Sequence, residues 1–182
     1  LTNEPSNILT TVEFAKTITQ LTKYGLKVRT LEEKDLKKLG MNALLGVGQG
    51  SPSPSKVMII EWKGVKSKKP LAIVGKGVVF DTGGISLKPP SGMEQMTVDM
   101  GGAGVVVGLM KTLALRKAKS NRLGNLKIGG RGGGETYDGP KLRVLEPLPQ
   151  QQQNNPVGAK CLRGLLHMLP KYAPISTKHH NR

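Results

Sequence analysis

The stretch that decides the fold of this 182-residue chain is Leu71–Asp81, which reads LAIVGKGVVFD. Its apolar side chains occur at consecutive rather than alternate positions, a pattern typical of a parallel strand buried on both faces. Lys76 interrupts the run and Asp81 ends it. Polar residues at the carboxyl end of a buried strand lie where open α/β sheets bind their ligands. The stretch therefore predicts an interior strand and a functional site at its end.

Helical and extended patterns alternate around this strand. A helix is predicted after Thr10, because Glu13 three residues later completes a capping-box pattern and Gly25 is a typical C-terminal cap. Its apolar face consists of Phe14, Ile18 and Leu21. Further strands are expected at Leu26–Leu31 and Val57–Trp62, and further helices at Leu31–Leu39 and Gly101–Lys119. This alternation predicts an α/β fold, a partial mixed sheet flanked by helices.

Basic residues gather in the last part of the chain. The sequence has 28 Lys+Arg against 12 Asp+Glu, and residues 111–182 hold 14 of these cations but 3 of the acids. From Ser120 on, 9 of 63 residues are Gly and 6 are Pro, and Gln150–Gln153 is a low-complexity tract. Such a composition buries too little apolar surface to offset the entropy of ordering. We therefore expect a folded domain over 1–120 and an irregular, basic, Gly/Pro/Gln-rich segment over 121–182.

Composition excludes several classes of protein. A disulfide scaffold or a four-thiolate zinc site needs more cysteine than Cys161 alone, and a single thiol fits a reducing compartment. The longest apolar runs, Leu71–Val74 and Val105–Met110, are far shorter than the roughly 20 residues of a membrane-spanning helix. No secretory leader is recognisable, and the sequence starts with Leu1 rather than Met. We expect a piece of a longer, cytoplasmic product.

Lys76, Asp81 and Asp99 are the residues from which a site can be built. A lysine inside a buried strand must be ion-paired, neutral or bound to a ligand. Metal coordination requires the neutral amine, and the two carboxylates supply hard oxygen ligands. A purely structural arrangement fits the same spacing: a buried Lys76–Asp81 ion pair, with Asp99 capping the helix that follows it. From the residues alone, both interpretations stay open.

A longer pattern around these residues resembles the metal-binding stretch of the leucyl (cytosol) aminopeptidase family of two-metal exopeptidases. It comprises Val74–Pro89 (VGKGVVFDTGGISLKP), Met93–Met96 (MEQM) and Asp99–Ala103 (DMGGA). Asn3–Thr10 resembles the beginning of that family's catalytic domain, and Gly40–Ser51 resembles its glycine-rich loop. The resemblance runs in register from Leu1 to about Ser120.

The resemblance implies roles for four residues. Lys76 and Asp99 match ligands of one metal ion, and Asp81 matches the carboxylate that bridges two ions. Lys88 matches the catalytic lysine that polarises the scissile carbonyl and steadies the tetrahedral intermediate. The implied cofactors are two divalent ions, Zn²⁺, Mn²⁺ or Mg²⁺, because carboxylates and one amine suit these better than soft metals.

By the family pattern the ligand set is incomplete. The family completes its site with Asn-Thr-Asp-Ala-Glu-Gly-Arg, a string that this sequence lacks and that Glu135 and Asp138 do not replace. With the residues of this sequence, one of the two metal ions would have three protein ligands, and the other would have Asp81 alone. The resemblance implies a cytoplasmic, hexameric metalloexopeptidase that releases N-terminal residues, preferably Leu, from peptides. For this 182-residue chain we predict no activity, and the hexamer is implied by the resemblance alone.

Other motifs in the sequence are weaker indications of function than this pattern. Gly46–Ser51 hints at a dinucleotide-binding loop, but its last glycine is displaced and no strand leads properly into it. The pair His179-His180 is typical of solvated histidines. The basic segment 121–182 supports an alternative function, a noncatalytic protein that binds acidic partners. Nucleic acid is a disfavoured partner, because aromatic residues make up 3% of the chain and no binding module is recognisable.

Overall fold

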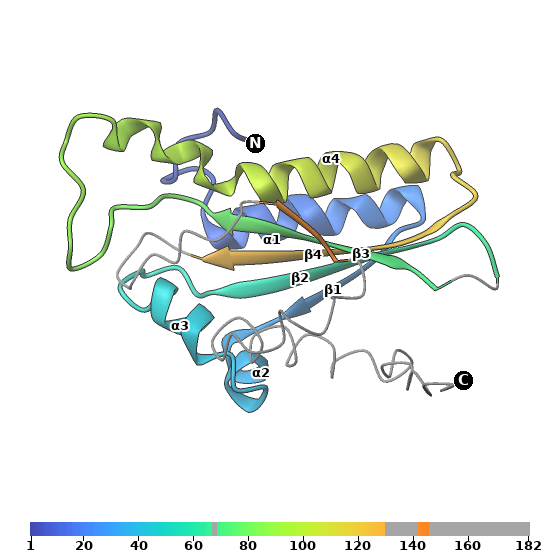
Figure 1. Cartoon of the computed structure of the whole chain (residues 1–182), viewed down its shortest axis with the longest axis horizontal. Coiled ribbons are helices and arrows are strands. Elements are labelled where there is room, and N and C mark those ends of the chain that lie inside the picture. The colour runs from blue at the N-terminus through green and yellow to red at the C-terminus, as the bar shows by residue number, and fades with distance from the viewer. Residues whose placement is uncertain (67–68, 130–141, 146–182) are drawn as a thin grey trace, which may run out of the picture.

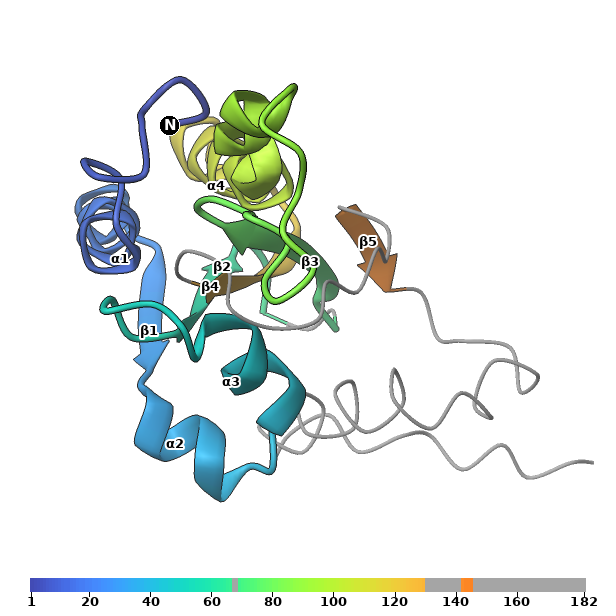
Figure 2. The same cartoon turned by 90° about the vertical axis from the view of Figure 1, so that its left-hand side faces the viewer.

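The computed structural model describes residues 1–66, 69–129 and, for the backbone, 142–145. These residues form three layers (Figure 1, Figure 2). Helices α1 (Thr11–Thr19) and α4 (Gly101–Leu115) cover one face of a sheet, and α2 (Glu33–Lys38) and α3 (Asn42–Gly48) cover the other. The α/β fold with helices flanking a mixed sheet agrees with the prediction.

The sheet contains five described strands in the order β1-β2-β4-β3-β5. Their bounds are Lys27–Leu31 (β1), Lys56–Lys63 (β2), Leu71–Val78 (β3), Asn121–Gly129 (β4) and Leu142–Leu145 (β5). β3 and β4 are parallel, whereas the other neighbouring pairs are antiparallel. The apolar run from Leu71 thus forms an interior strand, as predicted, although the strand ends at Val78.

Both faces of the sheet are buried, and β2 shows why. Met58 and Ile60 point into the core beneath α1 and α4, while Val57 and Ile59 point into a second core beneath α2 and α3. Because neighbouring side chains of a strand point to opposite faces, a continuous apolar run can serve both cores.

The first helix forms as its sequence pattern predicts. The Thr10 hydroxyl accepts a hydrogen bond from the Glu13 backbone N–H (3.2 Å), and Phe14 and Ile18 are completely buried. A 3₁₀ turn, η1 (Gln20–Tyr24), extends α1. Gly25 ends it with a left-handed φ of 83°, the conformation that favours glycine at a helix C-terminus.

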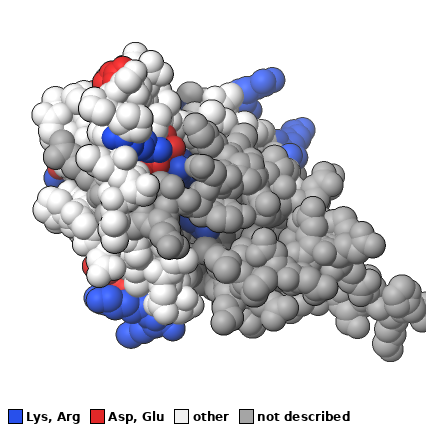
Figure 3. All heavy atoms as spheres, turned by 60° about the vertical axis from the view of Figure 1, so that its left-hand side comes forward, with Lys and Arg blue, Asp and Glu red and all other residues white. Residues whose placement is uncertain are grey.

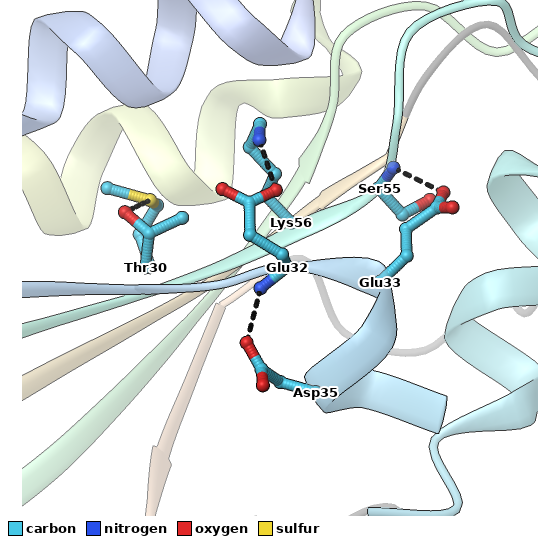
Figure 4. A network of polar contacts seen from close by, with 7 residues as sticks. Thr30, Glu32, Glu33, Asp35, Ser55 and Lys56 are labelled. Atoms are coloured by element: carbon cyan, nitrogen blue, oxygen red, sulfur yellow. Dashed lines mark hydrogen bonds and ion pairs between the residues drawn. The ribbon is translucent and has the colours of Figure 1, made fainter. Parts of the chain in front are cut away.

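A polar network fastens α2 to β2 (Figure 4). The Lys56 ammonium, whose side chain is 10% exposed, pairs with a Glu32 carboxylate oxygen at 2.5 Å. The Ser55 backbone N–H donates to Glu33 Oε1 (2.9 Å), and the Glu32 N–H donates to Asp35 Oδ2 (3.2 Å). The nearby Gly46–Ser51 stretch begins inside α3, so it does not form the loop between a strand and a helix that dinucleotide binding requires.

Helix α4 continues the 3₁₀ helix η2 (Met93–Met100) without a break. Together they make a run of 23 residues in which an 18-residue window has a mean hydropathy of 1.4, long and apolar enough to span a membrane, which the shorter apolar runs did not predict. Ala103, Val106 and Met110 are completely buried in the core over the sheet, as expected for a core helix. The helix ends at Leu115, four residues earlier than predicted, and Lys117 has a φ of 47°.

Strand β4 shows that the irregular segment was predicted to start too early. Asn121–Gly129 lies between β2 and β3, and its Leu126 and Ile128 are completely buried. A composition averaged over 63 residues conceals a strand of nine residues. Residues 130–141 and 146–182 lie outside the described part of the chain, so for them the irregular segment stays a prediction. Glu135, Asp138, Cys161 and His179-His180 lie there too.

Candidate metal centre

The carboxyl end of β3 brings Lys76 next to Asp99. Lys76 belongs to β3 and Asp99 to the last turn of η2. The Lys76 Nζ lies 2.9 Å from Asp99 Oδ1, and their side chains are 22% and 5% exposed. An ion pair this sheltered from water is electrostatically stronger than a surface pair, and it costs more to disrupt.

Close packing of α4 on β3 sets the position of Asp99. A Cβ atom added to Gly75 would lie 2.5 Å from the Gly102 carbonyl oxygen, at the start of α4. Only a glycine therefore lets the helix approach the strand so closely. Because Asp99 lies two residues before the first residue of α4, this approach also places its carboxylate beside the strand.

A tight loop after β3 brings Lys88 next to Asp81. Gly83 and Gly84 have φ values of 90° and 76°, and a Cβ on Gly83 would lie 2.4 Å from the Ser86 carbonyl oxygen. The Lys88 N–H donates to the Thr82 carbonyl (2.9 Å), which closes the loop. Lys88 Nζ then lies 3.4 Å from Asp81 Oδ2, and the Gly83 N–H donates to Asp81 Oδ1 (2.8 Å).

The observed ion pairs differ from those of the purely structural interpretation of these residues. Among the described residues the ion pairs join Lys76 to Asp99 and Lys88 to Asp81, rather than Lys76 to Asp81. The N-cap of α4 is Met100 and no side chain caps the helix, so the interpretation of Asp99 as a cap is wrong. Ion pairs between a buried carboxylate and a partly exposed lysine do form, but their partners come from segments that the loop and η2 bring together.

The structure gives one of these residues an oxygen that a cation could bind. Asp99 Oδ2 is buried and has no hydrogen-bond partner in the described residues, so one lone-pair-bearing oxygen is free to bind a cation. Lys76 can coordinate once its amine loses a proton. Among the described residues no three His, Cys, Asp or Glu side chains are grouped to hold a metal, at the end of β3 or elsewhere. The structure joins Lys76 to Asp99 and Lys88 to Asp81, so a ligand set of Lys76, Asp81 and Asp99 stays a prediction.

The surface away from these pairs offers a weaker candidate. An open cleft of about 490 Å³ lies over the Glu32–Lys56 network and is lined by α1 residues, but it includes none of the four predicted site residues. On the face shown in Figure 3, Lys and Arg atoms gather in small groups, one of them over α2, with acidic atoms beside them. Lys56 in the cleft is already neutralised by Glu32. We therefore place the candidate site at the end of β3.

Fold and site together define a class of protein: a three-layer α/β domain with carboxylates and lysines at the carboxyl end of an interior strand, where such domains bind ligands. The profile of the cytosol aminopeptidase family, catalytic domain, matches residues 1–127. The chain belongs to this family. The match ends within β4, seven residues beyond the predicted boundary at 120.

Individual relatives agree with this assignment. The chain is 64% identical over 124 residues to a probable cytosol aminopeptidase of Dinoroseobacter shibae, which covers 68% of this chain and 25% of the relative. It is similar to the leucine aminopeptidase of Caenorhabditis elegans (TM-score 0.68, 27% identity, 79% of this chain and 30% of the other). It is also similar to a bottromycin maturation enzyme in complex with Mn (TM-score 0.65, 34% identity, 80% and 32%). The chain thus spans about a quarter of the length of its curated relatives.

Proposed function

We propose that this chain binds one divalent ion, Zn²⁺, Mn²⁺ or Mg²⁺, through Lys76, Asp81 and Asp99. The observation that supports this proposal is the Lys76–Asp99 pair at 2.9 Å, in which the second, buried oxygen of the Asp99 carboxylate has no hydrogen-bond partner among the described residues. A divalent cation next to Asp99 would satisfy that oxygen. The Mn named with the similar bottromycin maturation enzyme supports the choice of a hard or borderline metal.

We propose that the full-length relatives release N-terminal residues, preferably Leu, from peptides in the cytoplasm, and that this reaction depends on bound metal. A bound ion supplies Lewis-acid polarisation and an activated water in such chemistry. Lys88, whose side chain is 33% exposed, can turn from Asp81 toward a peptide carbonyl and stabilise the developing negative charge. The hexamer stays a proposal that rests on the family resemblance.

For the 182-residue chain itself we propose that peptide hydrolysis is absent. The family string, whose Asp and Glu ligate metal and whose Arg holds a bicarbonate that acts as general base, has no counterpart in this sequence. Losing a general base alone typically costs about 10²–10⁴-fold in rate, and an incomplete second metal site removes the shared activated water as well.

Calorimetric titration of the full chain with Mn²⁺ or Zn²⁺ tests the metal site. We expect one ion per chain and loss of binding in Asp99→Asn, while Glu94→Gln, which changes an exposed acid of the same 3₁₀ helix, binds as the unmodified chain does. Equal binding by both variants would exclude Asp99 as a ligand.

Hydrolysis of Leu-p-nitroanilide with each metal supplied tests the predicted inactivity. We expect no turnover by the unmodified chain. Lys88→Ala serves as the control for a contaminating host enzyme. Turnover that disappears in this variant would show that the chain is a working peptidase and that the second half of the site is not needed.

A further inference from the structure

The two carboxylates of the candidate metal centre differ in how far the chain itself satisfies them. Both oxygens of Asp81 have a partner: Oδ1 accepts from the Gly83 N–H (2.8 Å), and Oδ2 lies 3.4 Å from Lys88 Nζ. Asp99 is paired with Lys76 through Oδ1, while its buried Oδ2 has no hydrogen-bond partner among the described residues. A cation can therefore bind Asp99 directly, whereas at Asp81 it meets the positive charge of Lys88.

Of the two lysines, Lys88 is the one that can release its carboxylate. Its Nζ lies 3.4 Å from Asp81, farther than the charge-assisted hydrogen bond of about 2.7–2.9 Å that Lys76 makes to Asp99. The Lys88 side chain is 33% exposed and stands on a loop, whereas that of Lys76 is 22% exposed and belongs to β3. A lysine ammonium on its flexible stem can exchange a carboxylate for water by rotating that stem.

The backbone around Lys88 can stay in place while its side chain moves. The Lys88 N–H donates to the Thr82 carbonyl (2.9 Å). A Cβ on Gly83 would lie 2.4 Å from the Ser86 carbonyl oxygen, so the loop is tightly closed. Release of Asp81 therefore requires rotation of one side chain and no rearrangement of the loop.

We propose that Lys88 is a built-in counter-ion of Asp81 that a divalent metal ion has to displace, so that metal binding is coupled to release of the Lys88 ammonium. This coupling rests on the metal site proposed above. Without metal, the ammonium neutralises a carboxylate that is 6% exposed and would be costly to leave unpaired. With metal bound, Asp81 no longer needs Lys88, whose ammonium becomes available to a peptide carbonyl.

Calorimetric titration of the full chain with Mn²⁺ tests the coupling. Lys88→Met keeps the length of the side chain, adds no ligand that Mn²⁺ favours, and should bind about tenfold more tightly than the unmodified chain, because no ammonium has to be displaced. Lys88→Arg keeps a positive charge beside Asp81 and should bind no more tightly than the unmodified chain. Affinity of Lys88→Met equal to or below that of the unmodified chain would overturn the proposal.

Lys69→Met is the control for the loss of one positive charge. Lys69 is exposed and lies before the opposite end of β3, about 23 Å away along the strand. This distance exceeds the screening length of about 8–10 Å, so the Mn²⁺ affinity of Lys69→Met should equal that of the unmodified chain. An equal gain in Lys69→Met and Lys88→Met would show an effect of net charge alone and would overturn the proposal.

The titration separates failure of the coupling from failure of the metal site. If Asp99→Asn binds Mn²⁺ as the unmodified chain does, the proposed site is wrong and the coupling fails with it. If Asp99→Asn abolishes binding and Lys88→Met changes nothing, the site stands and the coupling alone fails. Binding that appears only in Lys88→Met supports the coupling, and absence of binding in both chains contradicts the site and the coupling together.

A double-mutant cycle without metal tests the ion pair itself. The unfolding free energies of Lys88→Met, Asp81→Asn and the double variant are measured in urea with a chelator present. Because the two side chains contact each other, the double variant should lose less unfolding free energy than the sum of the two single losses. Additive losses would show that Lys88 does not neutralise Asp81 and would overturn the proposal whatever the titration gives.

Discussion

Replacement of Gly75 by alanine should separate α4 from β3. The new Cβ would lie 2.5 Å from the Gly102 carbonyl oxygen and 2.8 Å from the Ala103 backbone nitrogen. Ordinary contacts of this kind are at least about 3.4 Å, so the start of the helix has to move outward by about 0.9 Å. Backbone atoms on both sides make this shift costly, because neither partner can rotate away. We expect a loss of about 2–3 kcal/mol of unfolding free energy, in the range of overpacked cores.

A second glycine of the same helix provides the control. A Cβ added to Gly108 meets no atom within 4 Å, and the residue lies inside α4. Gly108→Ala should therefore stabilise the chain by about 0.5–1 kcal/mol through helix propensity alone. The two glycine-to-alanine changes are chemically identical, yet they should differ by roughly 3 kcal/mol in unfolding free energy.

Urea unfolding followed by far-UV circular dichroism measures both variants. The Gly75→Ala variant should also bind Mn²⁺ more weakly than the unmodified chain, since the shift moves Asp99 away from Lys76. Unfolding free energies of Gly75→Ala and Gly108→Ala within about 0.5 kcal/mol of each other, the range of ordinary surface substitutions, would refute the close approach of α4 to β3.

Two further substitutions test local features by the same urea unfolding. Thr10→Ala removes the acceptor for the Glu13 N–H and should lower the unfolding free energy by about 1 kcal/mol. Thr17→Ala, at an exposed hydroxyl inside α1, should change it by a few tenths of a kcal/mol. Equal losses in the two variants would exclude the cap. Glu32→Gln leaves the ammonium of Lys56, 10% exposed, without its counter-ion and should cost about 1–2 kcal/mol. The matched change Lys16→Gln breaks an exposed pair and should cost under about 0.5 kcal/mol, so a similar loss in both would contradict the sheltering of Lys56.

The sequence predicted local elements because their signals are local. The cap at Thr10 and the left-handed Gly25 depend on residues within one turn, and both are observed. The partners of the site lysines depend on tertiary structure. Lys76 and Asp81 are five residues apart but do not pair with each other. The tight loop at Gly83 places Lys88 beside Asp81, and η2 places Asp99 beside Lys76.

β4 was missed although its sequence contains a signal. Leu126 and Ile128 alternate correctly for one core, but Gly124 interrupts the pattern. A Cβ at Gly124 would lie 2.9 Å from Val106 Cγ1, so this glycine makes room for α4 rather than marking a loop. That reason is visible only after the helix is placed on the sheet.

The position of β4 sets a waiting time during synthesis. β2 and β3 follow each other in the chain, yet β4 lies between them, so neither has its inner partner until Gly129 has been made. From Lys63 to Gly129 the ribosome adds 66 residues, which takes about 3–13 s at typical elongation rates. During this interval the nascent chain exposes the apolar edge of β2, with Val57–Ile60, to any other extended segment. Chaperone demand for this domain should therefore peak before its last described long strand leaves the ribosome.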